Sequence, residues 1–154
     1  MIQRIQTVYL LLVVVLLVAT LFMPLLTLQI GQEFFSMDAS GVSSLINQEA
    51  TALGTTWGLF ALTAIIALVA MVTIFLYKNR ILQIRLCVFN ALLMIGFYAY
   101  VAFLVWRWQG EVPEMQWQLK LGLAFPVIAL ILDYLAIRNI GADEALVRSL
   151  DRLR

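Results

Sequence analysis

Four long apolar segments dominate the sequence and restrict the folds that the chain can adopt. They cover residues 7–28, 56–77, 81–106 and 119–137. About 20 apolar residues in a helix cross a hydrocarbon layer of about 30 Å, so each segment is long enough to span a bilayer. Of all residues 64% are hydrophobic and 12% charged, whereas soluble domains carry about a quarter charged residues. The segments predict an all-α, integral membrane four-helix bundle that forms one domain over residues 1–154.

The first apolar segment is expected to remain as a span and not to be removed as a signal peptide. The apolar core of a signal peptide has about 7–15 residues and is followed by small residues at the cleavage site. Here the segment is longer and continues through Pro24 into LLTL.

Composition argues against several classes of function. The net charge is +1, the chain has no His, and Cys87 is its single cysteine. A nucleic-acid partner therefore has no electrostatic support. Zinc chemistry and a His-based catalytic triad lack their usual residue, so we expect no metal, no cofactor and no enzymatic activity.

The Lys and Arg residues are divided unequally between the two predicted sides of the membrane. Eight lie on the side of the termini, and two, Arg107 and Lys120, lie on the other. Cytoplasmic flanks retain positive charge, so both termini are expected inside, with an external loop at 29–55 and a cytoplasmic tail at 138–154. The eight are Arg4, Lys78, Arg80, Arg85, Arg138, Arg148, Arg152 and Arg154.

All four tryptophans lie near the external boundary. Amphipathic indole rings favour the headgroup level of a bilayer. The sequence therefore predicts an aromatic belt made of Trp57, Trp106, Trp108 and Trp117.

Asp133 lies about one turn inside the fourth span, where an unpaired carboxylate is costly. Arg85 lies at a similar depth in the third span, so the two are predicted to form a structural ion pair. A stripe of mostly small residues on the fourth span supports this, as does the face of the third span that bears Arg85. The stripe on the fourth span contains Gly122, Pro126, Ala129, Asp133 and Ala136. The face of the third span contains Arg85, Leu92, Gly96 and Ala99. A proton or ion relay, or separate extension of both side chains to water, are the alternatives.

Asn90 lies about 140° around the third helix from Arg85. It is therefore expected to face another neighbour, the first or second span. An interhelical hydrogen bond is the predicted role of its carboxamide.

The tail has its own helical pattern. Asn139, Ile140 and Gly141 are expected to interrupt the fourth helix, after which a short amphipathic helix resumes. About 13 residues are too few for a stable isolated helix, so its apolar stripe must be covered. The membrane surface with the basic inner loop is one candidate, and a separate cytosolic or membrane protein is the other. The partner-binding residues would be Leu146, Val147, Arg148, Leu150, Arg152 and Leu153.

Both ends of the chain carry a family resemblance. The opening MIQRIQTVYLLL and the closing DEALVRSLDRLR, on either side of four spans, resemble the Bacteroidota family known as domain of unknown function 4293. The resemblance covers the whole chain and implies a multi-pass protein of the bacterial inner membrane. It implies no activity, substrate or catalytic residue.

These features favour a non-enzymatic accessory or structural subunit of a larger inner-membrane complex, in protein export, envelope biogenesis or respiration. The helix surfaces and the tail would be its interfaces, because the loops are short. The alternative is an oligomeric small-solute or ion transporter or channel component. An oligomer is expected in that case, because one four-helix bundle offers few polar groups around a central site.

Overall fold

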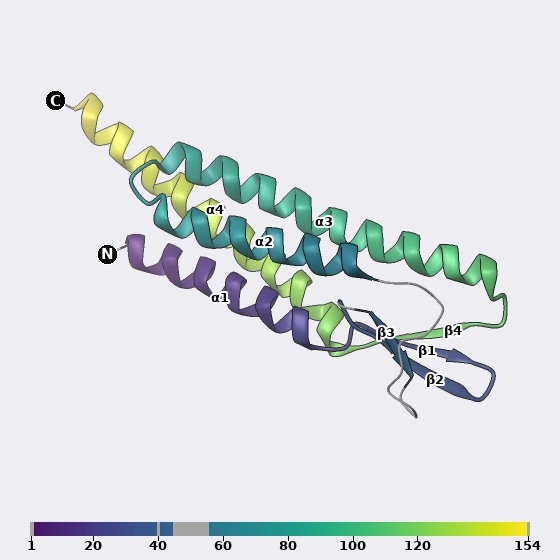
Figure 1. Ribbon diagram of the computed structural model, residues 1–154. Coiled ribbons are helices and arrows are strands. Elements are labelled where there is room, and N and C mark those ends of the chain that lie inside the picture. Colours follow the sequence, from purple (N-terminus) through teal and green to yellow (C-terminus); the bar gives the residue numbers. More distant parts are fainter. Residues whose placement is uncertain (1, 40, 45–55, 154) are drawn as a thin grey trace.

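The computed structural model describes residues 2–39, 41–44 and 56–153, without the side chains of residues 2–4, 43 and 44. Four helices form an elongated bundle (Figure 1): α1 (Ile2–Phe22), α2 (Trp57–Phe75), α3 (Arg80–Glu111) and α4 (Leu121–Arg152). Helix α1 packs against α2 and α4, and α3 packs against the same two helices. The helices therefore form a ring in chain order. Both termini and the turn between α2 and α3 lie at one end of the bundle.

All four helices are long and apolar enough to cross a membrane. Large apolar side chains also cover their outer surfaces, for example Leu11 (54% exposed), Leu68 (64%) and Ile131 (55%). In water such a surface would be unfavourable at about 25 cal/mol per Å² of apolar area. The outer surface is therefore suited to hydrocarbon, as the four apolar segments predict.

A small antiparallel sheet closes the end of the bundle opposite the termini (Figure 1). It contains β1 (Leu26–Ile30), β2 (Glu33–Met37), β3 (Val42–Ser44) and β4 (Gln116–Leu119), in the order β3-β2-β1-β4. The turn between β1 and β2 contains Gly31 at φ 64°, a backbone conformation that glycine adopts without strain. Strand β4 pairs with β1, with Leu26 opposite Leu119. The sheet thus joins the α1–α2 connection to the α3–α4 connection.

The all-α prediction is therefore incomplete, and the first span ends earlier than predicted. Helix α1 ends at Phe22, two residues before Pro24, because proline lacks the amide hydrogen that a helix needs and disfavours helical backbone at the residue before it. The LTLQI that follows is a strand, with Leu26 and Leu28 buried. The predicted loop 29–55 contains the end of β1 followed by β2 and β3, and its residues 40 and 45–55 lie outside the described part.

Helix α4 does not break at Asn139–Gly141, so the prediction of a separate tail helix is wrong. It runs without interruption through Pro126 and Gly141. Glycine inside a helix costs about 1 kcal/mol relative to alanine. The buried Ile140 and Asp143 on either side of Gly141 hold the helix against the bundle and offset that cost.

Within the described residues, the buried core consists of two clusters. The larger lies between the helices and the sheet and includes Leu17, Leu59, Phe97, Leu28 and Met37. The smaller contains Leu10, Cys87, Ala136 and Ile140 near the end with the termini. Aliphatic packing therefore extends along the length of the bundle, and the buried polar groups interrupt it.

Candidate functional site

Asp133 lies in the bundle interior and is fully buried. It shares the inner face of α4 with Gly122, Pro126, Ala129 and Ala136, which are all buried. The predicted inner stripe of the fourth span is therefore confirmed. Its small residues allow close approach, because a Cβ at Gly122 would lie 2.5 Å from the carbonyl oxygen of Pro24.

The face of α3 that was predicted to meet this stripe is the wrong one. Arg85, Leu92, Gly96 and Ala99 are all exposed on the outer surface. The buried face lies elsewhere on the helix and contains Gln83, Cys87, Asn90, Met94, Phe97, Val101, Leu104 and Trp108. An arginine near the end of a span can reach water from a lipid-facing position, so its place in the sequence does not identify the inner face.

The structure consequently does not bring Arg85 and Asp133 together. In the described ranges, side-chain ion pairs join Arg107 to Glu111 and Arg148 to Glu144, and neither involves Asp133. The Cys87 thiol lies close enough to interact with the Asp133 carboxyl group. Neither carboxylate oxygen has a hydrogen-bond partner among the described residues, and the same holds for the Asn90 carboxamide.

Asn90 and Asp133 occupy the same level of the bundle. Helices α3 and α4 are antiparallel, and Arg80 Nη1 donates a 3.5 Å hydrogen bond to the carbonyl of Asp143. Cys87 lies seven residues after Arg80 on α3, and Ala136 lies seven residues before Asp143 on α4. Both belong to the smaller core cluster. Three further residues along each helix reach Asn90 and Asp133. We call Cys87, Asn90 and Asp133 the buried polar layer.

Each buried polar group without a partner costs about 1–3 kcal/mol, and more when it is charged. The predicted interhelical hydrogen bond of Asn90 is not present in the described part of the chain. The polar groups of Asn90 and Asp133, which lack a hydrogen-bond partner among the described residues, therefore do not stabilise the bundle.

Side-chain hydrogen bonds join the helices at the end with the termini. Gln6 of α1 donates to the carboxylate of Asp143 on α4. Gln83 of α3 donates to the Thr73 carbonyl of α2 over 3.2 Å. Sequence reasoning gave Gln6 no role. The polar Gln6 next to an apolar run was the available signal.

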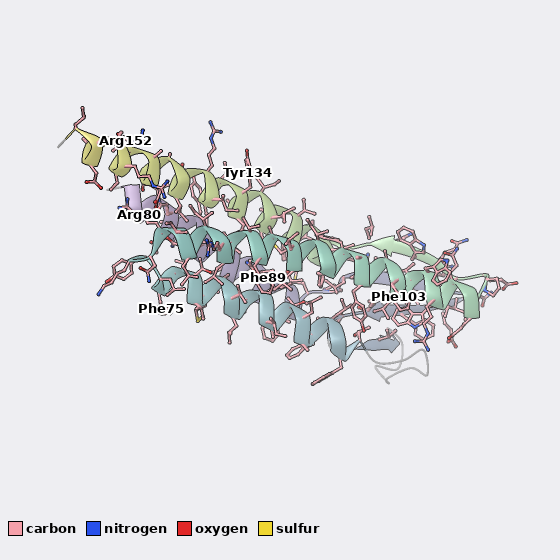
Figure 2. All side chains as sticks on the ribbon, turned by 90° about the horizontal axis from the view of Figure 1, so that it is seen from above. Phe75, Arg80, Phe89, Phe103, Tyr134 and Arg152 are labelled. Carbon is pink, nitrogen blue, oxygen red and sulfur yellow. The ribbon has the colours of Figure 1, made fainter. Side chains whose placement is uncertain are left out.

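An open groove of about 870 Å³ lies between the α2–α3 turn and the last turns of α4. Figure 2 shows Arg80 and Arg152 at this end of the molecule, with Phe89 and Phe103 successively farther along α3. Arg80, Arg85 and Arg148 line the groove together with Lys78, Glu144 and Asp151. The groove is thus bordered by more basic than acidic side chains.

The last turns of α4 extend past the other helices (Figure 1). Leu146, Val147, Leu150 and Leu153 are exposed there, so the predicted apolar stripe is not covered by the described part of the chain. Glu144 and Arg148 form an ion pair at 3.1 Å on the same segment, and Arg152 is exposed.

The four tryptophans do not share one environment. Trp57, Trp106 and Trp117 are 69%, 72% and 46% exposed, whereas Trp108 is 3% exposed. Trp108 belongs to the larger core cluster with Met115. It therefore fills the junction between α3 and the sheet, and three tryptophans stay available for a membrane boundary.

Residues 2–153 match the family model described as domain of unknown function (DUF4293). The chain belongs to the DUF4293 family. The matched region contains all four helices and the sheet, so the predicted resemblance is confirmed over its full extent. No match was found among curated proteins or among solved structures.

No group of three or more potential metal ligands occurs among the residues that the structure describes. The polar sites that the described part of this DUF4293 member offers include the buried polar layer, the hydrogen bonds of Gln6 and Gln83, and the basic groove.

Proposed function

We propose that this DUF4293 protein is a non-enzymatic accessory subunit of a larger complex in the bacterial inner membrane, with both termini in the cytoplasm. The complex would act in protein export, envelope biogenesis or respiration. The observation that carries the proposal is the uninterrupted extension of α4, along which Leu146, Leu150 and Leu153 are exposed beyond the bundle (Figure 1). A cytosolic partner, or the cytosolic part of a membrane partner, would cover this apolar stripe.

The distribution of charge supports the proposed orientation. Lys78, Arg80 and Arg138 belong to the end with the termini, whereas Glu33 and Glu111 belong to the end with the sheet. This asymmetry matches the positive charge of cytoplasmic flanks. Arg154, which sequence reasoning also placed inside, lies outside the described residues.

The orientation can be tested with single cysteines in a Cys87→Ala background. Gln32 lies in the β1–β2 turn and Arg152 in the last turn of α4. A membrane-impermeant maleimide should label Gln32→Cys on intact spheroplasts and Arg152→Cys only after lysis. The reverse pattern would overturn the proposed orientation.

The partner can be tested by purifying the tagged full chain from its native membrane in mild detergent. A partner should be recovered in fixed ratio with the wild type and lost with Leu150→Asp. Ser149→Asp adds the same charge one residue away, where Ser149 Oγ donates to the Leu146 carbonyl, and should retain the partner. Purification of the wild type without any partner, or equal loss in both variants, would overturn the proposal.

The buried polar layer favours the alternative, an oligomeric small-solute or ion transporter component. Ionisable groups inside a bilayer often mark transport pathways. The unbroken course of α4 through Pro126 gives this alternative less support, since many transporter sites use discontinuous helices. Solute or ion flux in proteoliposomes that is abolished by Asp133→Asn, with the fold unchanged, would favour transport.

A further inference from the structure

The groove beside the α2–α3 turn contains basic groups that form no ion pair with a carboxylate of the described part. Arg148 is paired with Glu144 at 3.1 Å. Arg80 donates to a backbone carbonyl, which leaves its positive charge uncompensated. Lys78 and Arg85 have no ion-pair partner within the described ranges. Three cations without an ion-pair partner in the described part therefore border one open groove, against a single carboxylate outside the Glu144 pair, Asp151.

An apolar track leads away from this groove along the outer surface of α3. Leu82, Arg85, Phe89 and Leu92 follow each other at intervals of three and four residues, so they lie on one face of the helix. Leu82, Phe89 and Leu92 are 42%, 50% and 61% exposed, and Arg85 is exposed among them. Arg85 thus lies within a hydrocarbon surface, near the end of that surface that meets the groove, and an amphiphile with an anionic headgroup complements this arrangement.

We propose that the groove and the track bind one anionic phospholipid, with its phosphate at Lys78, Arg80 and Arg85 and an acyl chain along the track. Arginine binds phosphate through charge-assisted and often bidentate hydrogen bonds. Basic pockets on the cytoplasmic side of membrane helices bind anionic headgroups. The proposal uses the proposed position of the chain in the inner membrane, but it does not require a protein partner.

The acidic groups of the groove give the site a second testable property. Glu144 neutralises Arg148, and Asp151 lines the groove as well. Removing the Glu144 charge would release Arg148 to the phosphate. Glu144→Gln should therefore strengthen lipid binding, in the opposite direction to Arg85→Gln.

The test measures lipid retention by the detergent-purified full chain with native mass spectrometry. Dioleoyl phosphatidylglycerol is the anionic probe and dioleoyl phosphatidylcholine the zwitterionic one. The wild type should retain one phosphatidylglycerol in clear preference to phosphatidylcholine. Arg85→Gln should weaken this retention about five- to tenfold, and Arg85→Lys should restore part of it.

Arg107→Gln is the matched control. Arg107 is an exposed arginine of the same helix, 64% exposed at its side chain, but it is paired with Glu111 near the other end of α3. This variant should leave retention unchanged within about twofold. Equal retention by wild type and Arg85→Gln, or an equal loss with Arg107→Gln, would overturn the assigned site.

Inorganic phosphate distinguishes a lipid headgroup from a free anion. At the same concentration it should not displace phosphatidylglycerol, because it makes no contact with the apolar track. Leu92→Ser, which makes the apolar track polar, should weaken lipid retention. If inorganic phosphate displaces the lipid and Leu92→Ser leaves lipid retention unchanged, the lipid assignment is overturned and the site binds free phosphate. Leu150→Asp changes the proposed partner site and not the groove, so this variant should retain phosphatidylglycerol. Loss of the protein partner and loss of the lipid can therefore be observed separately.

Discussion

Gly122→Ala tests the contact between the start of α4 and the connection from α1 to β1. A Cβ at this position would lie 2.5 Å from the Pro24 carbonyl oxygen and 3.0 Å from the Met23 Cβ, whereas carbon and oxygen without a covalent bond approach to about 3.3 Å at closest. The Pro24 backbone cannot move away freely. The neighbouring Leu25 N–H donates to the Met37 carbonyl over 2.8 Å, and the Leu25 carbonyl accepts from Lys120 N–H over 3.1 Å.

The magnitude follows from two opposing effects. Overpacking of a rigid contact costs about 1–3 kcal/mol, and the upper value applies because the obstacle is fixed backbone. Alanine returns about 1 kcal/mol of helix propensity relative to glycine. We therefore expect Gly122→Ala to lower the free energy of unfolding by about 2 kcal/mol, which corresponds to a melting temperature lower by about 4–8 °C.

The measurement is unfolding of the detergent-solubilised full chain, followed by tryptophan fluorescence and circular dichroism. Gly96→Ala is the matched control, because a Cβ at the exposed Gly96 meets nothing within 4 Å. It should be neutral or raise the free energy of unfolding by up to about 1 kcal/mol. Equal stability of the two variants would refute the close approach at Gly122.

Three further predictions use the same unfolding measurement. Asp133→Asn should raise the free energy of unfolding, because an unpartnered carboxamide costs less to bury than an unpartnered carboxylate; a decrease would mean that the carboxylate has a partner. Gln6→Leu should lower it by about 1.5–3 kcal/mol, and by less in an Asp143→Asn background, since the two side chains share one hydrogen bond; additive effects would argue against that bond. Trp108→Ala should cost about 3–5 kcal/mol, whereas Trp106→Ala, at a side chain that is 72% exposed, should change stability by less than about 0.5 kcal/mol. Similar losses in the two tryptophan variants would contradict their different burial.

The four helices and the inner face of α4 could be predicted from the sequence. Apolar length alone sets the number of helices that can cross a bilayer. On α4 the small residues Gly122, Ala129 and Ala136 recur at helical spacing beside Asp133, and the amphipathic pattern identifies the face. Both predictions depend on local sequence and needed no knowledge of distant contacts.

The sheet could not be predicted in the same way. Its strand β1 continues the first apolar run almost without a change in composition, and β4 has four residues. Pairing of β1 with β4 joins residues about ninety positions apart, from Leu26 to Leu119. Such pairing leaves little local signal, because strand propensity depends strongly on the neighbours that a strand acquires.

The facing of α3 and the course of the tail also required the structure. Helix α3 is apolar on all sides, so its sequence lacks a clear polar face, and Arg85 was a poor guide to its orientation. Helix α4 continues through Gly141 because Asp143 is bonded to Gln6. At both places tertiary contacts decide the structure, and the local residue type does not.

Pairing of β1 with β4 has a mechanical consequence for the whole molecule. Backbone hydrogen bonds fasten the helix connections to each other at one end. At the opposite end the helices are connected by side-chain contacts such as Gln6 with Asp143 and by the short turn after Phe75. Any rocking of the helices would therefore have its fulcrum at the sheet and its greatest amplitude near the termini, where the basic groove opens.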